Sequence, residues 1–188
     1  MFAIEIIIKD SLYAVNYGAT NEFRRLFTLW QNPEYLEDFF ETHKSDLQSE
    51  FFGNITIEDA IKKTIDEAYE FEQLVLTIAE TGNICVEECL ETYFKSLYNH
   101  DKYTYPIPVY EKRKAYGPGT KSWLRLYAIR IDDNVFIITG GGIKLTRTMN
   151  EREHLQEELQ KMEQVKKLLI SEGIIDNDSL INYIELQF

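Results

Sequence analysis

Hydrophobic residues recur at every second position in two parts of the chain, a pattern typical of β-strands with one buried face. The first part lies within residues 1–10, where Phe2, Ile4, Ile6 and Ile8 share one side. The second covers residues 123–131, with alternate residues facing opposite ways: Trp123, Arg125, Tyr127 and Ile129 on one side, Leu124, Leu126, Ala128 and Arg130 on the other. A turn at residues 132–134 and an apolar run at 135–139 complete a predicted hairpin.

Between residues 20 and 82 the hydrophobic spacing changes to three and four, which predicts helices. One helix follows Asn21, a second begins at Pro33, and a third runs from a cap at Thr56 to about Glu80. Aromatic residues form a stripe on the first two helices: Phe23, Phe27, Trp30, Tyr35, Phe39 and Phe40. We interpret this stripe as core, because no glycine-rich loop or cluster of ligands accompanies it.

The remaining segments predict a mixture of helix and loop. A shorter helix is expected up to about Asn99, with Val86, Leu90, Phe94 and Leu97 on its apolar side. It carries Cys85 and Cys89 near its start, both as small buried residues. Residues 103–119 hold three of the four prolines and predict a long irregular connection. A charged amphipathic helix is expected from Asn150 to about Ser171, whereas residues 181–188 fit a strand or a short helix equally well.

This order of elements lacks the regular strand–helix alternation of a parallel sheet. We therefore expect an α+β fold in which a small antiparallel sheet packs with helices, and a single compact chain over residues 1–188. Its 188 residues are 44% hydrophobic and 13% aromatic, which suffices for a core and excludes low-complexity disorder.

Composition also bears on where the protein acts. The apolar start is interrupted by Glu5 and followed by Lys9 and Asp10, so it does not resemble a signal peptide. No uncharged apolar run is long enough to cross a membrane, and no membrane partner is expected. The two cysteines, Cys85 and Cys89, are spaced too closely for a useful disulfide. These features favour a reducing, cytoplasmic location.

The net charge of -12 argues against a nucleic-acid partner until its distribution is considered. Residues 34–91 carry 16 acidic and only three basic side chains, whereas residues 112–147 carry eight basic and two acidic ones. The basic residues are Lys112, Arg113, Lys114, Lys121, Arg125, Arg130, Lys144 and Arg147. Either this segment is a basic surface that binds phosphates, or the two charged parts neutralise each other within the fold.

Familiar catalytic motifs are missing. The chain has no Gly-x-Ser-x-Gly, no His-Glu-x-x-His and no cysteine pairs for zinc, and its three histidines lie far apart in sequence. Gly140, Gly141 and Gly142 resemble a phosphate-binding loop, but neither the P-loop ending nor the dinucleotide spacing is present, which favours a bulge or bend. No metal site or cofactor is therefore expected.

A cluster of basic and aromatic residues remains the best candidate for chemistry. On a hairpin, Arg125, Tyr127, Lys144 and Arg147 can share one neighbourhood, where guanidinium groups hold a phosphodiester and aromatic rings stack on bases. Cleavage of RNA by its own 2′-hydroxyl requires deprotonation of that hydroxyl and stabilisation of charge on phosphorus. Arginines together with a lysine or tyrosine of shifted pKa meet both needs without a metal ion.

The sequence over residues 123–131 and 134–149 resembles the strand, strand and basic segment of RelE/ParE-superfamily toxins, especially the HigB-like branch. Arg125 matches the family's strand arginine, Lys144 a lysine of its basic segment, and Arg147 with Thr148 a later basic–threonine pair. Ile143 stands where a second lysine is common, and Met149 where a proline is common. The resemblance covers about residues 85–171 and leaves the acidic helical region at 20–82 as an addition to the core.

This resemblance implies the toxin of a toxin–antitoxin system that acts in stress responses as a metal-independent mRNA endonuclease, free or on the ribosome. Its implied partners are mRNA and a cognate antitoxin protein. Arg125, Tyr127, Lys144 and Arg147 would be catalytic, and the RNA-binding residues would be Lys112, Arg113, Lys114, Lys121 and Arg130. The alternative hypothesis is a non-catalytic toxin-like module that uses its acidic helices or basic strands to bind protein partners.

Overall fold

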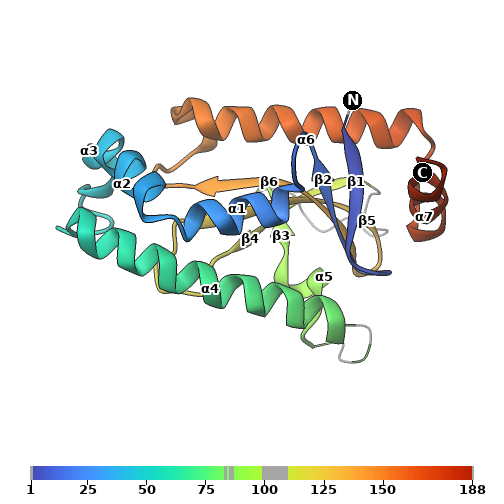
Figure 1. The fold of residues 1–188 in the computed structure, drawn as a ribbon, viewed down its shortest axis with the longest axis horizontal. Coiled ribbons are helices and arrows are strands. Elements are labelled where there is room, and N and C mark those ends of the chain that lie inside the picture. Colours follow the sequence, from blue (N-terminus) through green and yellow to red (C-terminus); the bar gives the residue numbers. More distant parts are fainter. Residues whose placement is uncertain (1, 83, 85–86, 99–109, 188) are drawn as a thin grey trace.

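The structure is a computed structural model that describes residues 2–82, 84, 87–98 and 110–187. Its helices and strands confirm the α+β class (Figure 1). The strands are β1 (Ala3–Ile8), β2 (Leu12–Asn16), β3 (Lys95–Ser96), β4 (Glu111–Tyr116), β5 (Leu124–Asp132) and β6 (Val135–Ile143). The helices are α1 (Glu22–Trp30), α2 (Pro33–Thr42), α3 (Lys44–Leu47), α4 (Ile57–Thr81), α5 (Leu90–Tyr93), α6 (Glu153–Ser171) and α7 (Asn177–Leu186), with a 3-10 turn at Met149–Glu151.

The described strands form one mixed sheet in the order β1-β2-β6-β5-β4-β3. Every neighbouring pair is antiparallel except β2 and β6, which run parallel with Leu12 opposite Phe136. The expectation of an antiparallel sheet was therefore wrong at this junction. A tight turn connects β1 to β2, a strand that the sequence did not predict. Because β2 pairs with β6, the hairpin of β1 and β2 extends the sheet that contains the hairpin of β5 and β6.

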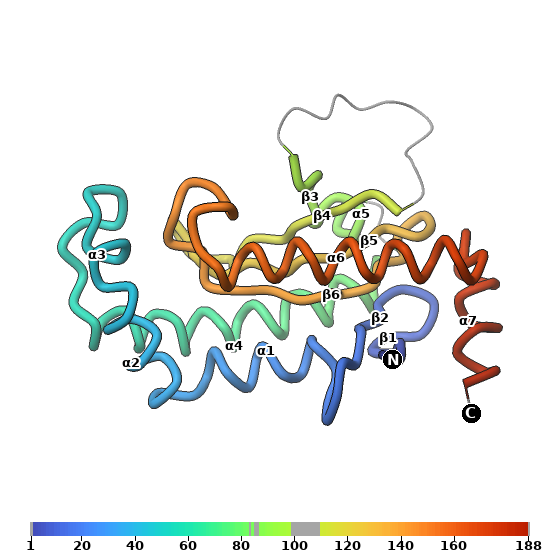
Figure 2. Tube along the Cα trace, turned by 90° about the horizontal axis from the view of Figure 1, so that it is seen from above, coloured from blue at the N-terminus to red at the C-terminus, as the bar shows by residue number. Residues whose placement is uncertain are grey.

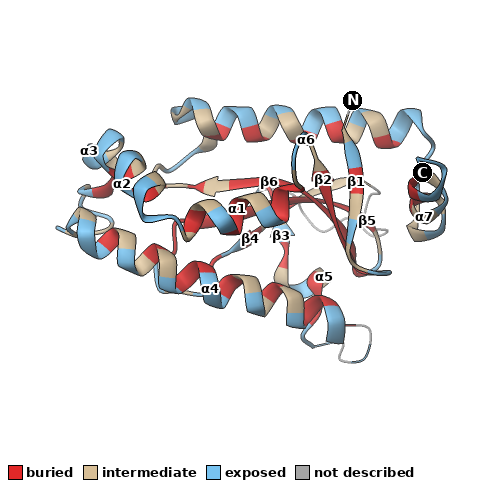
Figure 3. Ribbon diagram, in the orientation of Figure 1, coloured by how far each residue is buried: buried red, intermediate tan, exposed pale blue. Residues whose placement is uncertain are grey.

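Helices cover both faces of the sheet (Figures 1 and 2). On one face, α1, α2 and α4 pack their apolar sides against residues such as Leu126, Ala128 and Ile138. On the other, α6 and α7 cover a second apolar cluster that includes Ile129 and Ile137. Figure 3 shows the buried positions turned toward the sheet along α4 and α6. This confirms that the aromatic stripe of α1 is core, since Phe27, Trp30 and Phe71 pack ring against ring.

The helix starts follow the capping signals in the sequence. Asn21 caps α1 by accepting a hydrogen bond from the amide of Arg24, and Asn32 caps α2 ahead of Pro33. Thr56 caps α4 through the amide of Asp59 at 3.1 Å, as predicted. No described helix is long and apolar enough to span a bilayer.

Three predicted segments differ from the structure. The helix expected at residues 86–99 is only the four-residue α5, because Cys89 is its cap and the chain then extends into β3. Cys89 is buried as expected, whereas Cys85 lies outside the described residues. Strand β4 occupies part of the connection expected at 103–119. The undecided carboxyl-terminal segment is helical, as α7.

The three consecutive glycines lie inside β6, not after it. Tyr127 pairs with Gly140 and Ala128 with Ile138, so Thr139 is an extra residue in β6 and forms a β-bulge. A bulge is therefore present next to the glycines, but the glycines themselves pair regularly with β5 and do not form it. The glycines are required by close approach: a Cβ at Gly140 would lie 1.7 Å from Oε2 of Glu158, and one at Gly141 would lie 2.5 Å from the carbonyl oxygen of Arg125. The run therefore lets α6 and β5 approach β6 closely.

Candidate functional site

Strand alternation divides the predicted basic residues between the two faces of the sheet. Arg125 and Tyr127 lie on the face covered by α6, as the pattern at residues 123–131 predicted. In β4, Lys114 shares this face, since it pairs with Tyr127 across the strands. Arg113 and Arg130 lie on the opposite face, beside α5. Of these five residues, Lys114, Arg125 and Tyr127 share one face of the sheet, and Arg113 and Arg130 lie on the other.

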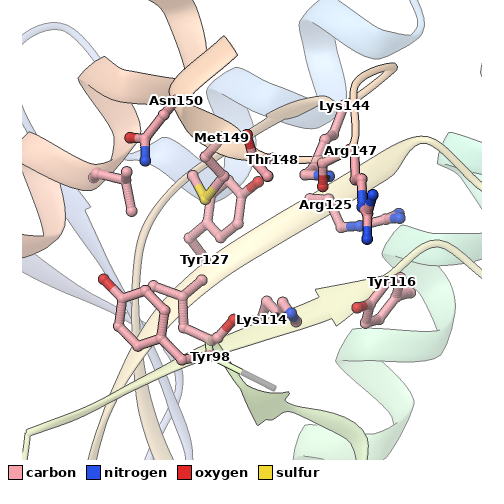
Figure 4. Close-up of a pocket in the computed structure, with 12 residues that line it drawn as sticks. Tyr98, Lys114, Tyr116, Arg125, Tyr127, Lys144, Arg147, Thr148, Met149 and Asn150 are labelled. Carbon is pink, nitrogen blue, oxygen red and sulfur yellow. Dashed lines mark hydrogen bonds between the residues drawn. The ribbon is translucent and has the colours of Figure 1, made fainter. Parts of the chain in front are cut away.

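The α6 side of the sheet contains a pocket of about 390 Å³ between β4, β5 and the segment that follows β6. In Figure 4, Arg125, Lys144 and Arg147 gather at one end, and Tyr127 and Met149 lie further along. The complete lining is Leu97, Tyr98, Lys114, Tyr116, Arg125, Tyr127, Lys144, Arg147, Thr148, Met149, Asn150 and Leu159. All four residues predicted to be catalytic line this single pocket.

Arg125 is held rigidly at the pocket wall. Its Nη1 donates to the carbonyl oxygens of Ser122 and Leu124, both at 2.8 Å, and its guanidinium carbon lies 4.0 Å from the ring centroid of Tyr116. Burial lowers the pKa of Arg125 from its usual value, but a guanidinium stays charged at any ordinary pH. The guanidinium N–H groups that do not bond to these carbonyls are available to donate to an anion such as phosphate.

Lys144 lies beside Arg125 in a partly buried position. Its Nζ donates to the carbonyl oxygens of Thr146 at 2.6 Å and Arg147 at 2.7 Å. Burial lowers the pKa of this lysine, and the positive charges of Arg125 and Lys114 lower it further. A lysine with a lowered pKa can release its proton and act as a general base more readily than an exposed lysine.

Tyr127 contributes a buried hydroxyl to the same pocket. The residue is 1% exposed, and its hydroxyl has no hydrogen-bond partner among the described residues. Burial raises the pKa of this phenol, so Tyr127 remains protonated and acts as a donor, not as a base. A buried hydroxyl without a partner costs free energy, and a ligand oxygen in the pocket would satisfy it.

A second cavity of about 830 Å³ adjoins the first and shares Tyr116, Arg125, Lys144 and Arg147 with it. Its other side is formed by the chain around α3, including Phe51 and Phe52, and by the loop that carries Lys121. The acidic helical region thus provides a wall beside the basic residues, and Arg147 remains exposed.

Three residues predicted to bind RNA have partners inside the protein. Arg113, 3% exposed, and Arg130, 5% exposed, both pair with Glu91. Lys112 pairs with Glu163 on α6. The structure thus places these three residues outside the pocket and beside acidic side chains of the fold, and we leave them out of the proposed site. The sequence did not predict β4, which carries Lys112 and Arg113, whereas it placed Arg130 on the side opposite Arg125, as found.

Two features of this region were missed. Tyr98 and Tyr116 line the pocket, and the alternation of Lys114 with Tyr116 could have indicated the latter. His43 and His154, far apart in sequence, have ring centroids 5.1 Å apart. No group of three or more His, Cys, Asp or Glu side chains within the described residues is arranged to hold a metal ion.

Comparisons with protein-family models, with curated proteins and with solved structures give no match to this chain.

Proposed function

We propose that the protein is an endoribonuclease that cleaves single-stranded mRNA, acting as the toxin of a toxin–antitoxin system, as its resemblance to RelE/ParE-superfamily toxins implies. One observation carries the proposal: Arg125, Lys144 and Arg147 converge on one pocket with the hydroxyl of Tyr127, which has no partner among the residues that the structure describes. Cations beside a buried donor fit a phosphodiester, whose oxygens accept hydrogen bonds and carry negative charge.

The reaction would use the substrate's own 2′-hydroxyl as nucleophile. Lys144, whose pKa burial lowers, would take the proton from the 2′-oxygen as that oxygen attacks phosphorus. Arg125 and Arg147 would bind the non-bridging oxygens, and Tyr127 would donate to the phosphate, where negative charge develops. The bond to the 5′-oxygen breaks, and that oxygen takes a proton from water. The products are a 2′,3′-cyclic phosphate and a 5′-hydroxyl.

Exposed aromatic rings beside these cations favour a single-stranded substrate. Tyr98 is 53% exposed and Tyr116 is 40% exposed, and both line the pocket. Unstacked bases bind such rings, whereas the bases of a duplex are unavailable. A cognate antitoxin would silence the enzyme by covering this pocket.

The test compares the wild-type protein with the double variant Arg125→Met/Lys144→Met. Methionine keeps much of each side chain's volume but removes its charge. We expect the wild type to arrest growth on induction and to cut a short single-stranded RNA in vitro, leaving cyclic phosphate ends. The double variant should cut at least about 100-fold more slowly, because a positioned general base alone contributes about that factor.

The matched control is Arg24→Met/Lys167→Met, which removes the same two charges at exposed positions on α1 and α6. It should cut RNA at the wild-type rate, and melting curves should show that all three proteins fold. An RNA with a 2′-deoxy sugar at the cleavage site should resist the wild type. Wild-type protein that binds RNA without cutting it would support the non-catalytic binding module, and wild-type protein that neither binds nor cuts would refute the proposal.

A further inference from the structure

The larger cavity beside the proposed active pocket is lined by features that suit a nucleotide. It shares Arg125, Lys144 and Arg147 with the active pocket, so one phosphate-binding wall faces two cavities. Asp46 and Glu151 also line it, but both carboxylates have partners: Asp46 pairs with Arg152, and Glu151 accepts from Thr148. Arg152 neutralises Asp46, whereas Glu151 keeps its charge; the four cations Lys121, Arg125, Lys144 and Arg147 outnumber it, so the lining carries a net positive charge.

An exposed aromatic ring forms part of this cavity. Phe51 is 62% exposed, which is unusual for so large an apolar side chain. Its ring packs edge-to-face on Phe52, with centroids 4.8 Å apart, and Phe52 packs in the same way on the buried Trp123 at 5.4 Å. Phe51 is thus supported by the core through Phe52, while more than half of its surface stays exposed. This is the arrangement of a stacking platform.

Lys121 lies next to that platform in a strained conformation. Its φ of 50° is in the left-handed region, which residues other than glycine rarely adopt. The exposed side chain donates from Nζ to the carbonyl oxygen of Phe51 at 3.0 Å and lies 5.1 Å from the Phe51 ring centroid. This backbone conformation, in the connection between β4 and β5, accompanies a placement of the Lys121 ammonium group over the Phe51 ring.

We propose that this cavity is a second nucleotide subsite, in which a base stacks on Phe51 and Lys121 binds the backbone phosphate of that nucleotide. The inference rests on the proposed function, because the shared wall of Arg125, Lys144 and Arg147 holds the scissile phosphate between the two cavities. One neighbouring base lies in the pocket with Tyr127, and the other lies on Phe51. The substrate is therefore a single strand that extends beyond a dinucleotide on the Phe51 side.

The experiment measures binding of fluorescent uridine oligonucleotides whose 2′-O-methyl groups prevent cleavage. A dinucleotide, a tetranucleotide and four tetranucleotides with one abasic position each are titrated against wild type, Phe51→Ala and Lys121→Gly. Phe51→Ala should weaken tetranucleotide binding about fivefold or more and leave dinucleotide binding unchanged, because loss of one stacked base has that effect. One abasic position should weaken binding by the wild type but not by Phe51→Ala.

Lys121→Gly tests the phosphate contact without adding backbone strain, because glycine accepts a positive φ, and a melting curve checks the loss of the hydrogen bond to Phe51. It should bind the tetranucleotide more weakly, and the slope of log affinity against log salt should fall by roughly 0.7, the effect of one lost contact with single-stranded nucleic acid. The control is Tyr69→Ala on α4, which removes an aromatic side chain that is 61% exposed and lines neither cavity. It should bind every probe as the wild type does.

The outcomes separate the two proposals. The subsite would be refuted if Phe51→Ala bound both oligonucleotide lengths with wild-type affinity and each abasic position weakened binding of the two proteins equally. That result would leave the proposed function intact. Failure of the wild type to bind either length would overturn the proposed function and the subsite with it.

Discussion

Replacing Gly140 by alanine tests whether the glycines of β6 are required for the close packing of α6 against this strand. The new Cβ would lie 1.7 Å from Oε2 of Glu158, and that oxygen accepts the amide of Gly141 at 3.0 Å. The carboxylate must leave, which breaks a hydrogen bond to a charged group and leaves a buried amide without a partner. Such changes cost about 2–4 kcal/mol of unfolding free energy.

For a chain of this length each kcal/mol lowers the melting temperature by roughly 2–4 °C, so Gly140→Ala should melt about 4–16 °C below the wild type. The matched control is Gly142→Ala, whose Cβ would meet Leu155 at an ordinary 3.4 Å and should change little. Gly141→Ala should be worse than either, because its Cβ would lie 2.5 Å from a backbone oxygen that cannot move aside.

A double-mutant cycle isolates the cause. In a Glu158→Ala background the clash at Gly140 has no target, so adding Gly140→Ala should cost almost nothing further. Urea unfolding curves of the four proteins provide the free energies. If Gly140→Ala melts within a degree of the wild type, or costs as much without Glu158 as with it, the reasoning from close approach is refuted.

Two further predictions concern charged groups. Lys114→Met removes a positive charge near Lys144, so the pKa of Lys144 should rise. The ascending limb of the pH–rate profile for RNA cleavage follows deprotonation of Lys144 and should therefore move to higher pH. A limb that does not move would exclude Lys144 as the base. Glu91→Ala removes a carboxylate that pairs with buried Arg113 and Arg130, and should lower the unfolding free energy in urea by about 1–3 kcal/mol; unchanged stability would show that their other partners suffice.

Local patterns in the sequence predicted the elements that local physics determines. The alternation at residues 123–131 placed Arg125 and Tyr127 on one face correctly, and Thr56 marked the start of α4, because strand parity and helix caps depend on neighbours in sequence. The same patterns brought Lys144 and Arg147 to that face, since they follow the adjacent strand.

The parts that were missed depend on partners distant in sequence. Strand β4 follows a proline-rich stretch and alternates only weakly, and its pairing with β5 decides that Lys114 lines the pocket and Arg113 does not. Phe51 lies in a connection without periodicity, and only the packing of Phe52 on Trp123 brings it to the second cavity. Whether these positions form an RNA-binding site remains the prediction that the experiments address.

The parallel pairing of β2 with β6 also constrains when the protein can fold during its synthesis. Residues 12–14 pair with residues 136–138, so more than 120 residues must be made before the middle of the sheet can close. At about 5–20 residues per second, the ribosome takes several seconds to add them. The basic pocket needs β6 and the segment after it, and it therefore forms late. The ribosome must therefore synthesise most of the chain before the pocket is complete.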